Sequence, residues 1–370
     1  MNQKILLLVT DLEIGGTPTV VRELAIRLRN RGHDVQVACL GRRGPVADQL
    51  RAAGVNVTAL EARGSMSLRI IPKFVAISKK EKIDTVLSFL VHANAVAAVA
   101  SLFTRNIRYI QSIQTTQLRP SWHWHVQALA ALRAERVIVP SPSVAVVAND
   151  YSLIPRKKIT VIPNAIDLAD FDLAHVKHSH DHRVGGKFRV GFIGRLDPIK
   201  RVGDLIEAAA RLREKIHLDI YGEGPERPRL ERLIRDLNLT DQVTMHGAID
   251  RPQEALAHLD ALVLPSEAEG FGLVLIEAMA ARVPVIATNA PGICDVVRDH
   301  ATGLLVPVGS PVALADAIDL LITDRRLRLG LSENALAHVR DHFTWEIVLP
   351  QYEQILLATA SSPSPAAPDR

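Results

Sequence analysis

The chain has 370 residues, of which 48% are hydrophobic and 23% are charged, and it contains only two cysteines. This composition excludes a disordered protein, and Cys39 and Cys294 are too few for a disulfide framework, which favours a reducing, cytoplasmic setting. No window reaches the ~18 apolar residues of a membrane span, and the N-terminus lacks the pattern of a secretory signal. At roughly 150 residues per domain, the length predicts two domains.

The charge is unevenly distributed along the chain. Residues 1–170 contain 22 Lys and Arg against 12 Asp and Glu, whereas residues 171–370 contain 22 against 28. A first half with a net charge of +10 predicts an anionic partner there, such as a lipid surface or a phosphorylated acceptor. Nucleic acid is the weaker hypothesis, because the basic residues are scattered and only 15 aromatic residues are available for base stacking.

In the first half, short apolar runs alternate with helical patterns. The expected helices cover 20–31, 70–81 and 93–103, and the expected strands cover 4–9, 35–39, 55–60, 85–89, 108–113, 137–140 and 159–162. Continuous apolar strands separated by helices are typical of a parallel sheet that is covered on both faces.

The alternation stops at a polar segment, 171–187, and then resumes. Further strands are expected at 188–193, 217–221, 243–246, 261–264 and 283–287, and a last helix at 345–358 precedes a Ser/Pro/Ala tail, 360–370, that is expected to be disordered. The sequence therefore predicts two doubly wound, Rossmann-like domains, 1–170 and 188–344, joined by a linker and facing each other across a cleft, with helix 345–358 packing back on the first domain.

Parallel sheets bind ligands beyond the carboxyl ends of their strands, so the loops after the strands are the candidate sites. The first such loop contains Gly15 and Gly16 just before a helix, where backbone N–H groups and the helix dipole suit a phosphate. The loop has neither the Walker pattern nor the glycine spacing of a dinucleotide site. A tight turn with no ligand is an equally good interpretation of this glycine pair.

The second loop follows the strand 188–193 and contains Gly194, Arg195 and Lys200. Pro198 is expected in the first turn of a helix, whose N-terminus would then point at the loop. The two cations can together neutralise a diphosphate, Arg195 through its planar fork and Lys200 as a point charge. Taken alone, Lys200 is better interpreted as a solvated surface charge.

The third loop follows the strand 261–264 and reads Glu269-Gly270-Phe271-Gly272-Leu273, with Glu277 two turns into the helix that follows. Its glycines leave amides open at the helix N-terminus, which suits a phosphate or sugar hydroxyls. Glu277 lies among apolar residues, so its carboxylate is either on an exposed stripe or buried with a hydrogen-bonding partner. A carboxylate can accept paired hydrogen bonds from the vicinal hydroxyls of a sugar.

At these three loops the chain resembles the retaining GT-B glycosyltransferases of family four, the glycosyl transferases group 1 type. The spacing Glu269-x7-Glu277 within Glu-Gly-Phe-Gly-x4-Glu-Ala-Met and the Gly194-Arg195-Leu196…Lys200 motif are highly specific, and the run from Tyr221 to Glu226, which includes Gly222, fits as well. The glycine pair in the first domain matches more loosely. The resemblance covers nearly the whole chain except the linker and the tail.

The resemblance implies a GT-B fold and transfer of a hexose or N-acetylhexosamine from a nucleoside diphosphate sugar, with a UDP-sugar expected, to a polysaccharide, lipid-linked or other cell-envelope acceptor, with retention. It implies no required cofactor or metal, and a cytoplasmic location, peripheral at the inner face of the plasma membrane. The catalytic residues would be Arg195, Lys200 and Glu269. The donor would contact Gly16, Gly194, Gly222, Gly270, Phe271, Gly272, Leu273 and Glu277, and the acceptor side would include Gly15 and His92.

Two departures from the family pattern stand out. Thr17-Pro18-Thr19 lacks the acid that many relatives carry in the first loop, and Gln114 stands near a position where many have a histidine. His92 resembles a family position, although a capped core histidine is an equal interpretation. Two alternative functions stay open, namely a GT-B nucleotide-sugar epimerase and a non-catalytic subunit that binds sugar nucleotides.

Two clusters are less informative. His175, His178, His180 and His182 have spacings compatible with a metal, but a plain connector is the preferred interpretation. Trp122 and Trp124 follow Arg119 in the basic half and suit a membrane interface, although packing of one or both in the core is slightly favoured. The nucleobase, the sugar, the acceptor and the oligomeric state are not predicted.

Overall fold

The computed structural model describes residues 3–61, 69–171, 186–212 and 215–358. The chain divides into two compact units, Met1–Asn164 with Glu346–Arg370, and Ala165–Trp345. Most of the predicted linker 171–187, including its four histidines, and the predicted tail 360–370 lie outside the described residues. Among the described residues, no helix is both long enough and apolar enough to cross a membrane.

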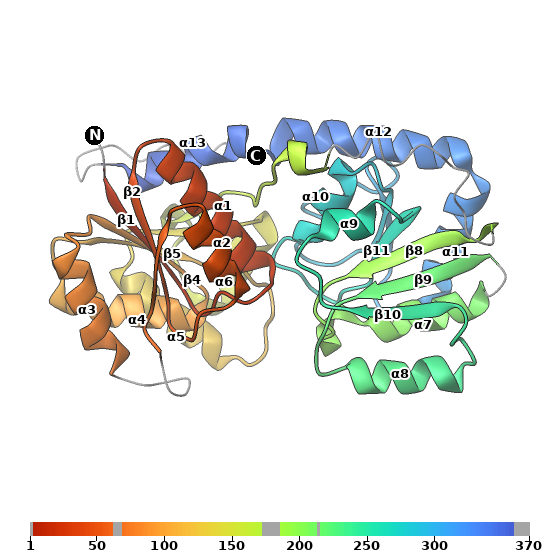
Figure 1. The fold of residues 1–370 in the computed structure, drawn as a ribbon, viewed down its shortest axis with the longest axis horizontal. Coiled ribbons are helices and arrows are strands. Elements are labelled where there is room, and N and C mark those ends of the chain that lie inside the picture. The colour runs from red at the N-terminus through yellow and green to blue at the C-terminus, as the bar shows by residue number, and fades with distance from the viewer. Residues whose placement is uncertain (1–2, 62–68, 172–185, 213–214, 359–370) are drawn as a thin grey trace. The chain divides into compact units, whose positions relative to one another are not determined.

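The first unit is built on a parallel sheet of seven strands in the order β3-β2-β1-β4-β5-β6-β7 (Figure 1). Its strands are β1 (Lys4–Val9), β2 (Asp34–Cys39), β3 (Asn56–Ala59), β4 (Thr85–Phe89), β5 (Arg108–Ser112), β6 (Arg136–Val139) and β7 (Ile159–Val161). Its helices are α1 (Gly16–Asn30), α2 (Pro45–Ala52), α3 (Ile70–Lys80), α4 (Val91–Ala100), the short 3-10 turn η1 (Ser101–Phe103), α5 (Trp122–Arg133), α6 (Pro142–Ser152), η2 (Arg156–Lys158) and α13 (Trp345–Leu356).

The helices of this unit cover both faces of the sheet. α1 packs on α2, whereas α3, α4, α5 and α6 pack side by side in that order. Because crossovers between parallel strands are right-handed, the helices that lead from β1 toward β3 and those that lead from β4 toward β7 lie on opposite faces. α13 returns to this sheet: Thr85 Oγ1 and Arg108 both donate to the carbonyl of Leu356, at 3.3 and 2.8 Å.

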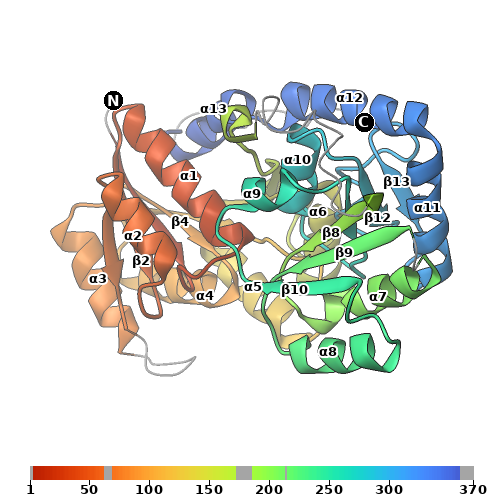
Figure 2. The same ribbon diagram turned by 45° about the vertical axis from the view of Figure 1, so that its right-hand side comes forward.

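The second unit contains a parallel sheet of six strands in the order β10-β9-β8-β11-β12-β13. The strands are β8 (Phe188–Ile193), β9 (Ile216–Tyr221), β10 (Val243–Gly247), β11 (Ala261–Leu264), β12 (Val285–Thr288) and β13 (Leu304–Val306). The helices are η3 (Leu168–Phe171), η5 (Pro198–Lys200), α7 (Val202–Arg211), α8 (Arg227–Asp236), α9 (Pro252–Leu256), α10 (Leu273–Ala280), α11 (Pro311–Thr323) and α12 (Arg325–His342). Figure 2 shows α7 and α8 beneath β8, β9 and β10.

The fold confirms the prediction of two doubly wound parallel-sheet domains. Pro198 begins a helical turn, as expected, but the turn is the short 3-10 helix η5, which ends at Lys200. Arg201 then adopts a left-handed conformation with φ of 49°, and the α-helix α7 starts only at Val202.

Candidate active site

Each sheet has one place where the strand order reverses, and the predicted site residues lie there. In the first unit the chain moves from β1 to β2 on one side and reaches β4 on the other. In the second unit the corresponding reversal of strand order lies between the neighbouring strands β8 and β11. Loops that diverge at such a switch point leave a crevice at the carboxyl ends of the strands, where doubly wound proteins bind ligands. Gly15 and His92 follow β1 and β4, whereas Lys200 and Glu269 follow β8 and β11.

In the second unit, the loops on either side of the switch point are joined by an ion pair. Lys200 Nζ donates to Glu269 Oε1 at 2.5 Å, and the side chains are only 21% and 11% exposed. Ser266 Oγ donates to the same carboxylate oxygen at 2.7 Å, and the amide of Glu267 donates to the carbonyl of Ile199 at 2.8 Å. An ammonium group carries three N–H donors, so Lys200 can hold Glu269 and an incoming anion together.

Arg195 is the second cation of this site. Its side chain is 67% exposed, and its guanidinium donates to both carboxylate oxygens of Asp197 at 2.8 and 3.0 Å. This bidentate pair lies within one loop and restrains the arginine beside the end of β8. The predicted cations Arg195 and Lys200 thus occupy the same loop, one on its surface and one partly buried.

The loop after β9 touches the loop after β8 through its backbone, and this contact requires glycine at position 222. The amide of Gly194 donates to the carbonyl of Tyr221 at 3.0 Å, and the amide of Leu196 donates to Glu223 at 2.9 Å. Gly222 has φ of 152°, and a Cβ there would lie 1.8 Å from the carbonyl oxygen of Gly194. Gly222 therefore shapes the predicted donor loop through backbone packing.

The segment after β11, Glu269 to Gly272, leads into the N-terminal end of α10. Gly270 and Gly272 remain partly exposed, and Gly272 caps the helix with φ of 81° before Leu273 begins it. The side chain of Phe271, in contrast, is 3% exposed and packs edge-on against Phe343, with ring centroids 5.4 Å apart. Any contact of Phe271 with a ligand is thus left to its backbone. Glu277 is 8% exposed, so of the two alternatives left open by the sequence the buried one holds.

In the first unit, Gly15 and Gly16 begin α1. A Cβ at Gly16 would meet no atom within 4 Å, and a Cβ at Gly15 would meet only Pro18 Cδ at 3.8 Å. The fold itself therefore does not require glycine at these positions. His92, in the first turn of α4, lies with its ring centroid 6.0 Å from that of Trp122 at the start of α5.

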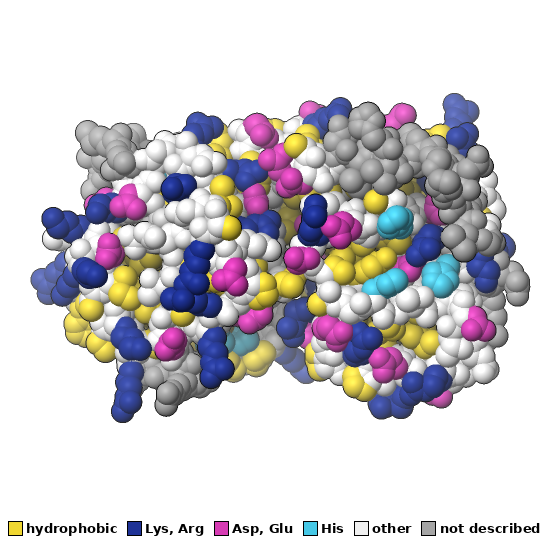
Figure 3. All heavy atoms as spheres, in the orientation of Figure 1, with side chains coloured by type: hydrophobic (Ala, Val, Ile, Leu, Met, Phe, Trp, Pro, Cys, Tyr) yellow, Lys and Arg dark blue, Asp and Glu magenta, His cyan; other side chains and the backbone are white. Residues whose placement is uncertain are grey.

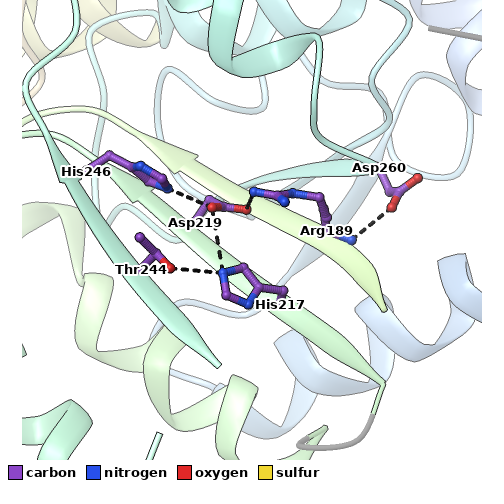
Figure 4. Close-up of polar contacts among 6 residues, drawn as sticks. All are labelled: Arg189, His217, Asp219, Thr244, His246 and Asp260. Atoms are coloured by element: carbon purple, nitrogen blue, oxygen red, sulfur yellow. Dashed lines mark hydrogen bonds and ion pairs between the residues drawn. The ribbon is translucent and has the colours of Figure 1, made fainter. Parts of the chain in front are cut away.

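A second polar cluster, which was not predicted from the sequence, lies on β8, β9 and β10. Asp219 is fully buried and accepts hydrogen bonds from Arg189 and His246, each at 2.7 Å (Figure 4). His217 Nε2 lies 3.8 Å from the same carboxylate. Figure 3 shows histidines gathered with hydrophobic side chains over this part of the second unit. The signal was present in the sequence, because His217, Asp219 and Tyr221 alternate with apolar residues along one strand.

The structure also places the two tryptophans and Cys294. Trp124 is 2% exposed and belongs to the core, whereas Trp122 is 47% exposed, so only one of the two tryptophans is available at the surface. Burial raises the pKa of the Cys294 thiol, which donates to Asn289 Oδ1 at 2.8 Å. The described part of the chain contains no group of three or more His, Cys, Asp or Glu side chains arranged to hold a metal ion.

Comparison with known families gives two adjoining matches that together span both units. Residues 14–170 match the glycosyltransferase family 4 model, and residues 177–338 match the glycosyl transferases group 1 model. The chain belongs to the group 1 glycosyltransferases. It is an enzyme of the GT-B fold, as the sequence motifs predicted.

Individual relatives of this glycosyltransferase agree with the assignment. N-acetyl-alpha-D-glucosaminyl L-malate synthase of Bacillus anthracis is 28% identical, over 92% of this chain and 93% of its own. A Campylobacter jejuni N-acetylgalactosaminyltransferase named for a diphospho-undecaprenol acceptor is 29% identical, over 71% and 73%. The crystal structure of Anabaena HepE in complex with UDP and glucose superposes with a TM-score of 0.87, at 22% identity over 97% of this chain and all of that one.

Proposed function

We propose that this glycosyltransferase moves a hexose or N-acetylhexosamine from a UDP-sugar to a polysaccharide, lipid-linked or other cell-envelope acceptor, with retention of configuration. The observation that carries the proposal is the Lys200–Glu269 pair at the switch point of the second sheet. It places one cation and one carboxylate where a doubly wound sheet binds its ligand. The UDP complexes of HepE support a uridine nucleotide as the donor carrier.

In the proposed reaction, Lys200 and Arg195 hold the diphosphate of the donor. As the bond between the anomeric carbon and the diphosphate breaks, negative charge grows on the leaving phosphate, and the two cations stabilise it. The acceptor hydroxyl forms the new bond to the anomeric carbon and passes its proton to a phosphate oxygen of the departing UDP. No metal or other cofactor is needed in this scheme, because the two side chains supply the positive charge.

The carboxylates are proposed to recognise sugar hydroxyls. Glu269, fixed by Lys200 and Ser266, suits the donor hexose, because a carboxylate oriented by two donors presents a rigid acceptor. Glu277 suits the ribose. The amides of Gly270 to Leu273, at the N-terminus of α10, suit the phosphates or the transferred sugar. Gly16 and Gly194 allow close approach of the backbone to the donor, and Gly15 and His92 face the acceptor side.

The acceptor and the location follow from chemistry more than from geometry. The relative named for a diphospho-undecaprenol acceptor supports a lipid-linked substrate. The net charge of +10 in residues 1–170 favours an anionic surface. We therefore propose a cytoplasmic enzyme that works at the inner face of the plasma membrane.

A thermal-shift panel of UDP, GDP and ADP, with and without their sugars and without added metal, tests the donor assignment. We expect UDP and a UDP-sugar to raise the melting temperature of the wild-type enzyme. Glu277→Gln should weaken UDP binding in calorimetry on the order of tenfold, the loss expected for one charged hydrogen-bonded contact. The surface variant Glu254→Gln serves as control, since Glu254 is an exposed residue of α9.

Two outcomes would contradict the proposal. A shift with GDP or ADP but not UDP would overturn the donor, and unchanged UDP affinity in Glu277→Gln would overturn the ribose contact. Transfer assays with UDP-glucose and UDP-N-acetylglucosamine, followed by NMR of the product's anomeric proton, then decide the sugar and the stereochemistry.

A further inference from the structure

The exposed apolar residues of the chain are concentrated on one side of the first unit. Of the 17 large hydrophobic side chains that are exposed among the described residues, ten fall between positions 99 and 153. They belong to α4, η1, the loop before α5, α5, α6 and the residue that ends α6, and these helices are neighbours on the same face of the sheet. A concentration of this kind marks an interaction surface, because single exposed apolar residues are normally scattered.

α5 supplies the central stripe of this surface. Trp122, His125, Leu129 and Leu132 follow one another at helical spacing and are all exposed, Leu129 at 66% and Leu132 at 74%. The opposite face of the same helix is buried through Trp124, Gln127 and Ala131. α5 is therefore apolar on the side that faces away from its sheet, where a helix of this kind normally carries charges.

Leu102 and Phe103 extend the stripe. They are 56% and 59% exposed in η1, and Arg133 of α5 donates from Nε to Ser101 Oγ at 3.0 Å, which fixes η1 beside the end of α5. We define the apolar patch as Leu102, Phe103, Trp122, Leu129 and Leu132. Figure 1 shows α5, which carries Trp122, Leu129 and Leu132, next to α4, which leads directly into η1.

The basic residues around the patch indicate which kind of partner would bind there. Residues 90–158 contain eight Lys and Arg against two Asp and Glu. Arg105, Arg119 and Arg133 are exposed and lie within a few positions of the patch residues. Basic residues that flank exposed Leu, Phe and Trp are the composition of a surface that binds anionic lipid. A second copy of this chain would instead bring two positively charged surfaces together.

The patch also reaches the acceptor side of the site. Its tryptophan, Trp122, begins α5 at the carboxyl edge of the sheet, where its ring lies 6.0 Å from that of His92. A membrane lying along α5 would thus hold the headgroup end of a lipid beside the loop that follows β4.

We propose that the apolar patch on η1 and α5, with its flanking arginines, docks this enzyme on an anionic membrane and presents a lipid-linked acceptor at His92. This deepens the proposed function, on which the lipid acceptor rests, whereas the docking itself does not depend on the donor.

The test is sedimentation of the full chain with vesicles of phosphatidylcholine alone or mixed with phosphatidylglycerol. We expect binding only to the anionic vesicles, weakened by added salt. Leu129→Ser with Leu132→Ser should lower the partition coefficient tenfold or more, on the order expected from removing two buried leucines from an interface. The triple variant Arg105→Gln, Arg119→Gln and Arg133→Gln should lower it on the order of 100-fold.

Matched controls separate docking from folding and from catalysis. Val312→Ser and Leu329→Ser remove exposed apolar residues of the second unit and should bind like wild type. All variants should keep the wild-type shift with UDP, and all except the arginine variant, which loses the hydrogen bond between Arg133 and Ser101, should keep the wild-type melting temperature. Vesicle binding that persists while UDP causes no shift would contradict the donor assignment and leave the docking surface standing.

Two results would overturn the docking surface. One is equal vesicle binding by wild type and by the double leucine variant. The other is a wild-type dimer in light scattering that the same variant converts to a monomer, because the patch would then be an interface between two copies of the chain.

Discussion

Lys200 Nζ lies 2.5 Å from Glu269 Oε1, although 69 positions separate the two residues in the chain. The pair spans the only reversal of strand order in the second sheet as described, between β8 and β11. It joins the cation that we assign to the diphosphate with the carboxylate that we assign to the sugar. Under the proposed function, binding of the diphosphate and binding of the sugar would be coupled through this one contact.

Removal of the cation should abolish most of the activity. Lys200→Ala should lower kcat on the order of 100- to 1,000-fold, because it removes charge stabilisation that is largest in the transition state. The fold should survive with a lowered melting temperature, because Glu269, whose side chain is only 11% exposed, loses its cation and keeps Ser266 as a donor. Steady-state assays with a UDP-sugar and calorimetric melting measure the two quantities.

The matched control for this variant is Lys215→Ala. Lys215 also pairs with a carboxylate, Asp319, at 2.5 Å, but this pair is exposed, and Lys215 lies at the amino end of β9, whereas Lys200 follows the carboxyl end of β8. We expect full activity in this variant. Near-normal turnover in Lys200→Ala would refute the role of Lys200.

Gly16 offers a test in which stability and function separate. A Cβ at this position meets no atom within 4 Å, so Gly16→Ala should leave the free energy of unfolding unchanged. If the backbone at Gly16 approaches the donor, the added methyl group should raise KM or lower kcat at least tenfold. Kinetics and urea denaturation of the same sample measure both effects.

Gly330→Ala is the matched control for Gly16→Ala. It lies in the interior of α12 and also has open space, so alanine should stabilise the protein by about 0.5–1 kcal/mol without changing activity. Gly222→Ala, in contrast to these two variants, should lower the free energy of unfolding, because its Cβ would collide with the carbonyl of Gly194. Full activity in Gly16→Ala would show that no ligand approaches this glycine.

The sequence located the candidate residues along the chain but did not predict their contacts. The loops that hold Arg195, Lys200 and Glu269, and the helix that holds Glu277, were identified because each motif is local and follows an apolar strand. The contact between Lys200 and Glu269 was not predicted, because it depends on β8 lying next to β11, and periodicity carries no information on strand order.

The burial of Glu277 and the environment of Phe271 likewise depend on tertiary packing. Whether Glu277 was buried depended on which side of α10 faces the sheet, and the helix is apolar on nearly every side. Phe271 looked like a ligand contact from its motif, but its ring packs on Phe343, 72 positions away, in a contact that no local pattern reveals.

The buried carboxylate of Asp219 should be important for stability and not for catalysis. Asp219→Ala leaves Arg189 and His246 without their shared partner and should cost about 3 kcal/mol in the free energy of unfolding. Asp319→Ala breaks an exposed ion pair and should cost less than about 1 kcal/mol. Urea denaturation compares the two variants, and equal losses would contradict a structural role for the Asp219 cluster.

His338 should make the stability of the enzyme depend on pH. The side chain is 7% exposed in α12, and burial, together with Arg298 and His342, lowers the pKa of His338 to about 4. The unfolded chain, with an ordinary histidine pKa near 6.5, therefore takes up a proton before the folded protein does. The stability contributed by neutral His338 is complete above about pH 6.5 and is lost as the pH falls toward 4, by about 3 kcal/mol in total.

His338→Gln removes this titration while keeping a polar side chain of similar length. We expect urea denaturation between pH 7 and pH 4 to show a shallower loss of stability in the variant than in the wild type, with the two curves separating below about pH 6.5. His300→Gln is the matched control, because His300 is exposed and its replacement should leave the wild-type slope unchanged. Parallel curves for wild type and His338→Gln would show that His338 is not held neutral in the folded protein. Because His338 packs against Phe343, which in turn packs against Phe271, protonation of the folded protein near pH 4 should also loosen the N-terminal end of α10. Measurements of UDP affinity between pH 7 and pH 4 would report this change.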